Sequence, residues 1–138
     1  MIQTIELLPG VTLRCFQDSR FKQGCLSLQL VRPMRREEAY KNALLSAVLL
    51  RGTRQHPDLR SITQRLDDLY GAAVSTLVRR VGDYQTVGLY CGFMDDRFAL
   101  PGDAVLEPLV DFVREILLDS PLEDGGFLPA FVEGEKKN

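Results

Sequence analysis

The sequence has few of the residues that metal and redox sites are built from. Its 138 residues include one histidine, His56, and three cysteines, Cys15, Cys25 and Cys91, with no Cys-x-x-Cys pair among them. Neither a cysteine-paired zinc site nor a dithiol redox motif is therefore indicated. An odd number of cysteines without a secretion signal is typical of reduced thiols, and we expect all three to be small buried hydrophobic side chains in strands.

The chain also lacks a strong charge of one sign and any long apolar run. Lys and Arg number 17 against 19 Asp and Glu, a net charge of −2, and the arginine-rich pieces at 32–36 and 79–80 are short. This excludes the basic field that a nucleic-acid-binding protein needs. No apolar run approaches the roughly 20 residues of a membrane helix, and residues 1–6 lack the basic and apolar regions of a signal peptide. We therefore expect a cytoplasmic protein with no nucleic-acid or membrane partner.

Other groupings of reactive side chains are better explained as ordinary surface. His56 lies in the polar segment 53–58, where we expect a solvated loop histidine; a metal site shared with the cysteines has no diagnostic spacing. The pairs Asp67–Asp68 and Asp95–Asp96 could bind magnesium or act as acid and base, but adjacent acids on a helix point apart, and the second pair lies in a turn. The Arg79–Arg80 and Asp83 group could bind a partner carboxylate or be a solvated turn. The isolated glycines have no phosphate-binding spacing.

The composition, 45% hydrophobic and 26% charged, is that of one globular domain. Alternating and β-rich patterns predict strands over 2–7, 11–17, 25–31, 73–80 and 84–93, and a polar turn at 18–24 separates the second strand from the third. Helical periodicity predicts helices over 36–50, 59–69 and 103–118, with the opening of another from 127 and a flexible loop at 119–126. This order predicts an α+β fold, an antiparallel sheet covered by helices mainly on one face.

The helix predicted over 36–50 is the most informative segment. Glu37 and Glu38 favour its first turn, and Gly52 stands just past its end. From residue 43 onward it is apolar almost all round apart from Ser46, which is typical of a helix buried on several sides. Ala43, Ser46 and Ala47 share one face through their i, i+3, i+4 spacing, and all three are small. No histidine stands near Ser46 in sequence, so a serine nucleophile is not indicated.

Five segments resemble, in order and spacing, the amino-terminal part of the pitrilysin/insulinase family of zinc peptidases, whose metal-binding helix reads H-x-x-E-H. They are the helix end Leu49–Thr53, the strand start Pro9–Arg14, the helix end Leu66–Ala72, the hairpin Val78–Val87 and the run Val132–Lys136. The resemblance covers nearly the whole chain. It implies the same α+β fold, a metallopeptidase-type domain.

The resemblance also aligns this chain with the family's catalytic residues. The two histidine ligands fall at Ala43 and Ala47, the general-base glutamate at Ser46 and the third zinc ligand at Glu133. Zinc peptidases need three ligands, an open position for water and a base to activate that water. Alanine donates no electron pair, serine is no base at neutral pH, and one carboxylate does not hold zinc. We therefore expect no zinc cofactor and no catalytic residue here.

Two hypotheses from different classes follow. One is a catalytically inactive peptidase homologue that serves as a structural or peptide-holding subunit, paired with a catalytically competent paralogue, as the resemblance implies for the family. The other is an active zinc metallopeptidase whose ligands are misaligned or lie outside this chain. A domain with an unrelated binding role is a third reading. The 138 residues match only the first part of a family domain, so we expect a single, truncated domain that self-associates to cover an open sheet edge or an apolar patch.

Overall fold

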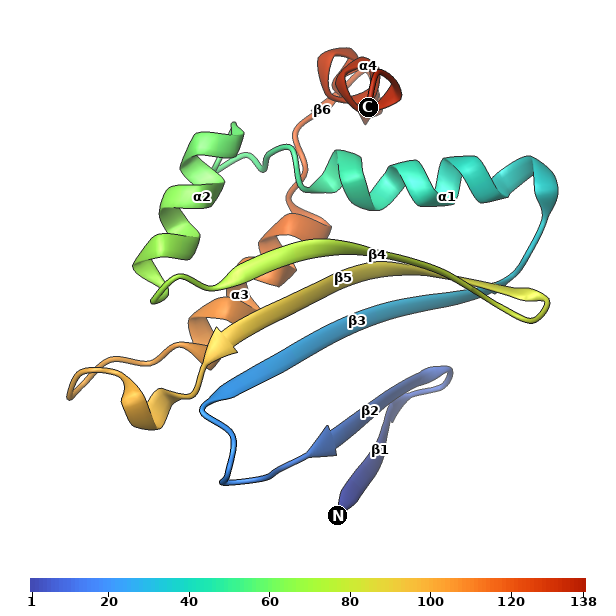
Figure 1. The fold of residues 1–138 in the computed structure, drawn as a ribbon. Helices are drawn as coiled ribbons and strands as arrows, with labels where there is room; N and C mark the ends of the chain where they lie inside the picture. Colours follow the sequence, from blue (N-terminus) through green and yellow to red (C-terminus); the bar gives the residue numbers. More distant parts are fainter.

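A three-stranded antiparallel sheet forms the centre of the computed structural model, which describes residues 1–138 (Figure 1). Its strands are β3 (Gln23–Pro33), β4 (Ala73–Val81) and β5 (Tyr84–Met94), with β5 in the middle. Gly82 closes the β4–β5 hairpin at a positive φ of 58°, a conformation that glycine adopts without strain. From β3 the chain passes through two helices to β4 and then turns into β5. Because β3 and β4 each pair only with β5, they are the two edge strands.

The first two strands form a separate hairpin. β1 (Ile2–Leu8) pairs with β2 (Val11–Phe16) through the Pro9–Gly10 turn, and neither strand joins the larger sheet. The strand predictions for this region are confirmed. The polar turn at 18–24 nevertheless does not make a hairpin, because β2 pairs with β1 and β3 pairs with β5.

Four helices complete the fold, at α1 (Arg36–Leu49), α2 (Leu59–Asp68), α3 (Leu106–Leu118) and α4 (Pro129–Lys136). Asp58 begins α2 with a capping box, since its carboxylate accepts from the Ser61 N–H at 2.8 Å while the Ser61 hydroxyl lies 3.3 Å from the Asp58 N–H. The segment predicted as a flexible loop, 119–126, instead holds a short hairpin, β6 (Leu122–Glu123) and β7 (Gly126–Phe127). None of the helices has the length and apolarity that crossing a bilayer requires.

The core lies between one face of the sheet and helices α1, α2 and α3. Leu89 and Cys91 of β5 meet the buried residues of α3, which are Leu109, Phe112, Val113 and Ile116. On the opposite face, the cross-strand row Ser27, Tyr90 and Ser75 is exposed. The predicted α+β fold, an antiparallel sheet with helices mainly on one face, is confirmed.

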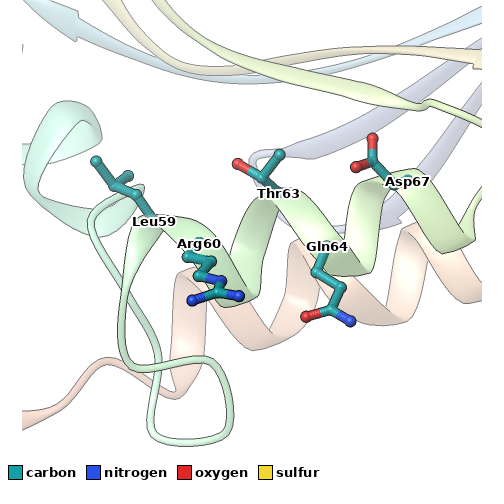
Figure 2. A pocket seen from close by; sticks show the side chains of 5 residues that line it. All are labelled: Leu59, Arg60, Thr63, Gln64 and Asp67. Carbon is teal, nitrogen blue, oxygen red and sulfur yellow. The ribbon is translucent and has the colours of Figure 1, made fainter.

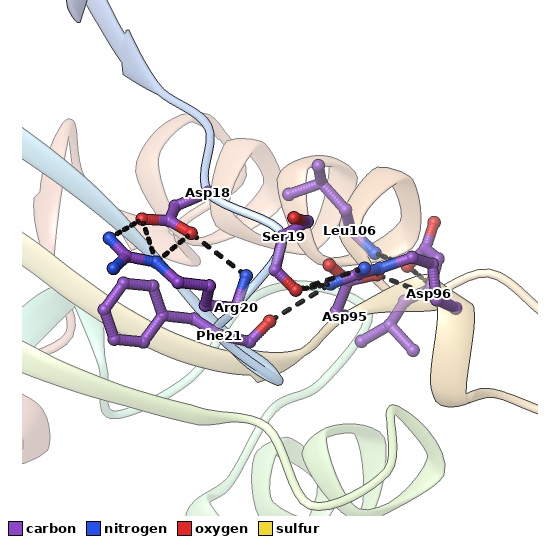
Figure 3. Close-up of polar contacts among 9 residues, drawn as sticks. Asp18, Ser19, Arg20, Phe21, Asp95, Asp96 and Leu106 are labelled. Carbon is purple, nitrogen blue, oxygen red and sulfur yellow. Dashed lines mark hydrogen bonds and ion pairs between the residues drawn. The ribbon is translucent and has the colours of Figure 1, made fainter. Parts of the chain in front are cut away.

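A polar network ties the start of β3 to the end of β5 (Figure 3). The Arg97 guanidinium donates to the Ser19 carbonyl at 3.3 Å and to the Phe21 carbonyl at 3.1 Å, and the Asp95 carboxylate holds its Nε at 3.1 Å. The side-chain bond from Arg97 lowers the pKa of Asp95. Asp96 accepts from the N–H groups of Val105 and Leu106 at the start of α3.

The expectation that Asp95 and Asp96 are merely solvated is therefore wrong. One carboxylate positions an arginine, and the other satisfies two unpaired N–H groups at a helix N-terminus. The bonds from the Val105 and Leu106 N–H groups to Asp96 also explain why α3 begins three residues later than predicted. Asp67 and Asp68 are exposed, as expected.

The three cysteines are not equivalent. Cys91 is 1% exposed and burial raises its pKa to about 11, whereas Cys15 and Cys25 are exposed, so the prediction of three buried thiols holds only for Cys91. Because the thiolate is the reactive form, iodoacetamide at pH 8 is expected to modify Cys15 and Cys25 and to spare Cys91 until denaturant is added. Intact-mass spectrometry against time measures this, and three equal rates would contradict the burial of Cys91.

Candidate functional site

The face of α1 that carries the three small residues Ala43, Ser46 and Ala47, here called the small face, lies in the carboxyl-terminal half of the helix. Ser46 is buried, and its hydroxyl donates to the Ala43 carbonyl of the same helix at 3.3 Å. Ala43 and Ala47, one turn apart, are half-buried. The hydroxyl is therefore engaged with the helix backbone, a common arrangement for a serine inside a helix. The small face can therefore present to a ligand only methyl groups and a hydroxyl that is already bonded within the helix.

Helix α4 packs against the carboxyl end of α1 and brings the two aligned segments together (Figure 1). The Arg51 guanidinium donates to the Glu135 carboxylate at 2.6 Å, with both side chains mostly buried. A Cβ at Gly134 would meet the same guanidinium at 2.8–2.9 Å, so the lack of a side chain there lets α4 approach closely. The contact is made through Glu135 and Gly134, not through Glu133.

Glu133 points toward solvent instead. Its side chain is 61% exposed and accepts from Lys136 at 3.3 Å, within α4. Zinc is held by nitrogen, sulfur or oxygen donors that converge on one point. Nowhere in residues 1–138 do three His, Cys, Asp or Glu side chains gather in that way. The donor set around Ala43, Ser46 and Ala47 does not fit a zinc ion.

A second polar link joins α1 to the middle strand. The Gln85 side chain, 5% exposed on β5, donates to the Ala39 carbonyl at 2.9 Å and accepts from the Asn42 side-chain amide at 3.1 Å. A buried amide with its donors and acceptors paired costs little and sets the position of one element against another. This link holds the amino-terminal half of α1 on the sheet. A lone glutamine at the start of a strand carries no sequence signal for such a contact.

The structure also assembles a cluster that sequence reasoning missed, built from Thr53, His56 and Glu115. The Thr53 hydroxyl, fully buried, donates to Glu115 Oε2 at 2.7 Å and accepts from the His56 N–H at 2.8 Å. His56 Nδ1 lies 2.6 Å from the same Glu115 oxygen, and its ring packs edge-on against Phe112. The expectation of a solvated loop histidine is therefore wrong.

This cluster borders an open groove of about 810 Å³ between the 53–57 loop and α3. His56, Arg65, Arg114 and Asp111 line it, so its walls carry charges of both signs. The Thr53 hydroxyl is directed to the carboxylate and not to the imidazole, so the three residues lack the nucleophile-to-base bond of a hydrolase triad. The arrangement pins the loop after α1 to α3.

A smaller hollow of about 460 Å³ lies along the exposed side of α2 (Figure 2). Figure 2 shows its lining side chains side by side along one helix, and they are Leu59, Arg60, Thr63, Gln64 and Asp67. They come from a single element and do not converge on a common point. This surface has none of the enclosed, mostly apolar character of a small-molecule site.

Comparisons with known proteins agree with the resemblance in part. No protein-family model matches the chain. A sequence relative is the protein named "Probable inactive metalloprotease YmfF" of Bacillus subtilis strain 168, which is 27% identical over 128 residues, covering 93% of this chain and 30% of that protein. The crystal structure of a conserved protein from Enterococcus faecalis V583 matches with a TM-score of 0.93 at 25% identity, covering 99% of this chain and 32% of that one.

The chain thus resembles a metalloprotease-like protein over nearly its whole length. It spans about a third of the length of each of these two proteins.

Proposed function

We propose that this chain is a catalytically inactive relative of the pitrilysin/insulinase zinc peptidases that holds or frames a peptide without cleaving it. One observation carries the proposal: the positions that resemble the H-x-x-E-H ligands and base are Ala43, Ser46 and Ala47, and the serine is bonded inside its own helix. The name of the Bacillus subtilis relative, an inactive metalloprotease, supports the same reading.

The sheet provides a means of holding a peptide. β3 and β4 each pair with β5 on one side only, so each leaves a row of backbone N–H and C=O groups unpaired. An extended peptide adds to such an edge as a further strand, and its backbone then supplies the hydrogen bonds. A mode of binding that needs no catalytic side chain suits a subunit that holds peptide for a competent paralogue, which would contribute the zinc.

The proposal includes a cytoplasmic location, which three unpaired cysteines support. It also includes the partner: co-expression with a paralogue that carries an intact H-x-x-E-H helix is expected to yield a heteromer on co-purification. Failure of the two chains to co-purify would remove the subunit role.

Zinc binding tests the lost site directly. The native chain, dialysed against zinc and then buffer, is expected to keep well below about one zinc per chain, because its α1 positions supply no donor. The variant Ala43→His/Ala47→His is expected to bind zinc at least about tenfold more tightly than the native chain, since two imidazoles four residues apart on a helix converge on one ion. Metal analysis and competition with a chromogenic chelator measure both.

Two controls make the zinc experiment specific. Gln64→His/Asp68→His places the same i, i+4 pair at two exposed positions of α2. Glu133→Gln in the Ala43→His/Ala47→His background removes the carboxylate aligned with the third ligand, which points to solvent in the native chain and would have to turn toward α1 to reach the ion. This change is expected to weaken zinc binding by about tenfold. If the α2 pair binds as tightly as the α1 pair, the alignment of Ala43, Ala47 and Glu133 with a zinc site is wrong. If the native chain keeps one zinc, or cleaves peptides in a chelator-sensitive way, it is not an inactive homologue.

A further inference from the structure

Two short arginine-rich pieces, far apart in the sequence, meet at one end of the molecule. One lies where β3 ends and α1 begins, and the other lies near the end of β4. Figure 1 shows the end of β3, the tip of the β4–β5 hairpin and the start of α1 on the same side of the molecule, at the right. We call the five arginines of these pieces the arginine end; they are Arg32, Arg35, Arg36, Arg79 and Arg80.

Backbone pairing fixes the two pieces against each other. The register of the sheet pairs Gln85 of β5 with Arg32 on one side and with Arg80 on the other. Neighbouring strands lie about 4.8 Å apart, so the backbones of these two arginines are separated by about 10 Å. The Met34 N–H also donates to the Asp83 carbonyl at 2.7 Å, which joins the chain after β3 to the hairpin turn. The two pieces therefore form one surface.

The arginine end is positive, although the whole chain is negative. The ranges 32–38 and 79–84 hold five arginines and three acids, whereas the chain holds 17 Lys and Arg against 19 Asp and Glu. All five arginines are exposed. This surplus creates a local positive potential that attracts anionic groups.

The acids of this end do not satisfy its arginines. Glu38 is shared by two of them, since its carboxylate lies 3.2 Å from Arg32 and 3.9 Å from Arg35. Arg36 and Arg79 take part in no ion pair. At least two guanidinium groups are therefore free to bind a carboxylate from outside the chain.

Two of the five arginines also stand where a positive charge opposes the fold. Arg35 is the N-cap residue of α1 and Arg36 is its first helical residue. The positive end of the helix dipole repels cations at these positions. Residues that oppose local stability concentrate at functional sites. A partner that supplies negative charge explains the arginines at the start of α1, and the stability of the isolated helix does not.

The side-chain chemistry of the arginine end favours carboxylates of a protein. Both pieces use arginine and not lysine, and the planar guanidinium matches a carboxylate with two parallel hydrogen bonds. Two exposed tyrosines adjoin it, Tyr40 one turn after Arg36 and Tyr84 beside the hairpin turn, at 60% and 51% exposure. Tyrosine and arginine are the residues that contribute most to protein interfaces.

We propose that the arginine end is a docking surface for an acidic segment of a protein, an extended stretch that carries several Asp or Glu side chains. Its carboxylates pair with the arginines that have no acid of their own, and the tyrosine rings pack against its apolar atoms. A nucleic-acid backbone is disfavoured, because it needs a longer basic field than five arginines interrupted by three acids. This surface uses side chains and is independent of the unpaired backbone groups at the sheet edges.

Fluorescence anisotropy with a labelled peptide of about 12 residues, in which Glu alternates with Gly, tests the proposal. The native chain is expected to bind this peptide with a dissociation constant below about 1 mM in a buffer of about 20 mM salt. Raising the salt to about 200 mM is expected to weaken binding at least about fivefold, because the charges lie at the surface. The same peptide with Lys in place of Glu is expected not to bind.

Charge reversal locates the binding surface. Arg36→Glu/Arg79→Glu changes two exposed arginines that form no ion pair, so no internal contact is lost, and binding is expected to weaken at least about tenfold. The matched control is Arg60→Glu/Arg114→Glu, which makes the same charge change at two exposed positions of α2 and α3. Its dissociation constant is expected to stay within about threefold of the native value. Far-ultraviolet circular dichroism and urea midpoints confirm that both variants keep the fold.

Four results would overturn the proposal. They are the absence of binding up to about 1 mM Glu-Gly peptide, equal binding of the Lys-Gly peptide, equal losses in the two double variants, and tighter binding of an oligothymidylate of the same charge. The last result would assign the arginine end to nucleic acid.

Discussion

Replacing Gly88 with alanine is expected to lower the free energy of unfolding of the chain strongly. Gly88 is buried in the middle of β5, opposite Gln29 of β3, and a Cβ at that position would overlap the Leu28 backbone carbonyl. A backbone oxygen in a strand ladder cannot move aside as a flexible side chain can, so β3 and β5 must separate locally. The cost is about 3 kcal/mol or more, a large share of the stability of a small domain.

Urea denaturation followed by circular dichroism measures this effect. Gly92→Ala is the matched control, because Gly92 lies on the same strand and a Cβ there meets nothing within 4 Å. Its urea midpoint is expected to stay close to that of the native chain, within about 1 kcal/mol in free energy of unfolding. Equal midpoints for the two variants would show that the backbone of β3 can yield at Leu28.

Replacing Thr53 with valine is expected to destabilise the chain by about 2–4 kcal/mol. Valine keeps the shape of the side chain but removes the hydroxyl, which leaves the His56 backbone N–H without its acceptor and takes away one of the two contacts at Glu115 Oε2. Thr53 is fully buried, so water cannot readily replace either contact. Each unsatisfied buried group costs on the order of 1–3 kcal/mol.

The control for this prediction is Thr53→Ser, which keeps the hydroxyl and removes one methyl group. Its expected cost is about 1 kcal/mol, the value of one buried methyl. The free energy of unfolding in urea is measured for both variants, together with hydrogen exchange at the His56 amide, which valine is expected to speed. If valine proves as well tolerated as serine, the cluster does not hold the 53–57 loop against α3.

The strands and helices were predictable because local patterns encode them. Alternating apolar residues placed β4 and β5, the stripe of Ile62, Leu66 and Leu69 placed α2, and the small face at 43–47 showed a helix without metal donors. The late start of α3 was not predictable, because it depends on Asp96, which lies ten residues upstream of Leu106 and caps the helix from another turn. Periodicity within a segment carries no information about such a partner.

The amino-acid sequence by itself determined the order of the elements, the α+β class and the inability of Ala43 and Ala47 to bind a metal, because each follows from the residues in one segment. Only the tertiary structure decided that Glu115 meets His56 across 59 residues, that α4 docks on α1 through Arg51 and Glu135, and that the β1–β2 hairpin stands outside the main sheet. These contacts depend on how distant segments pack, and packing is set by the shape and burial of the whole chain.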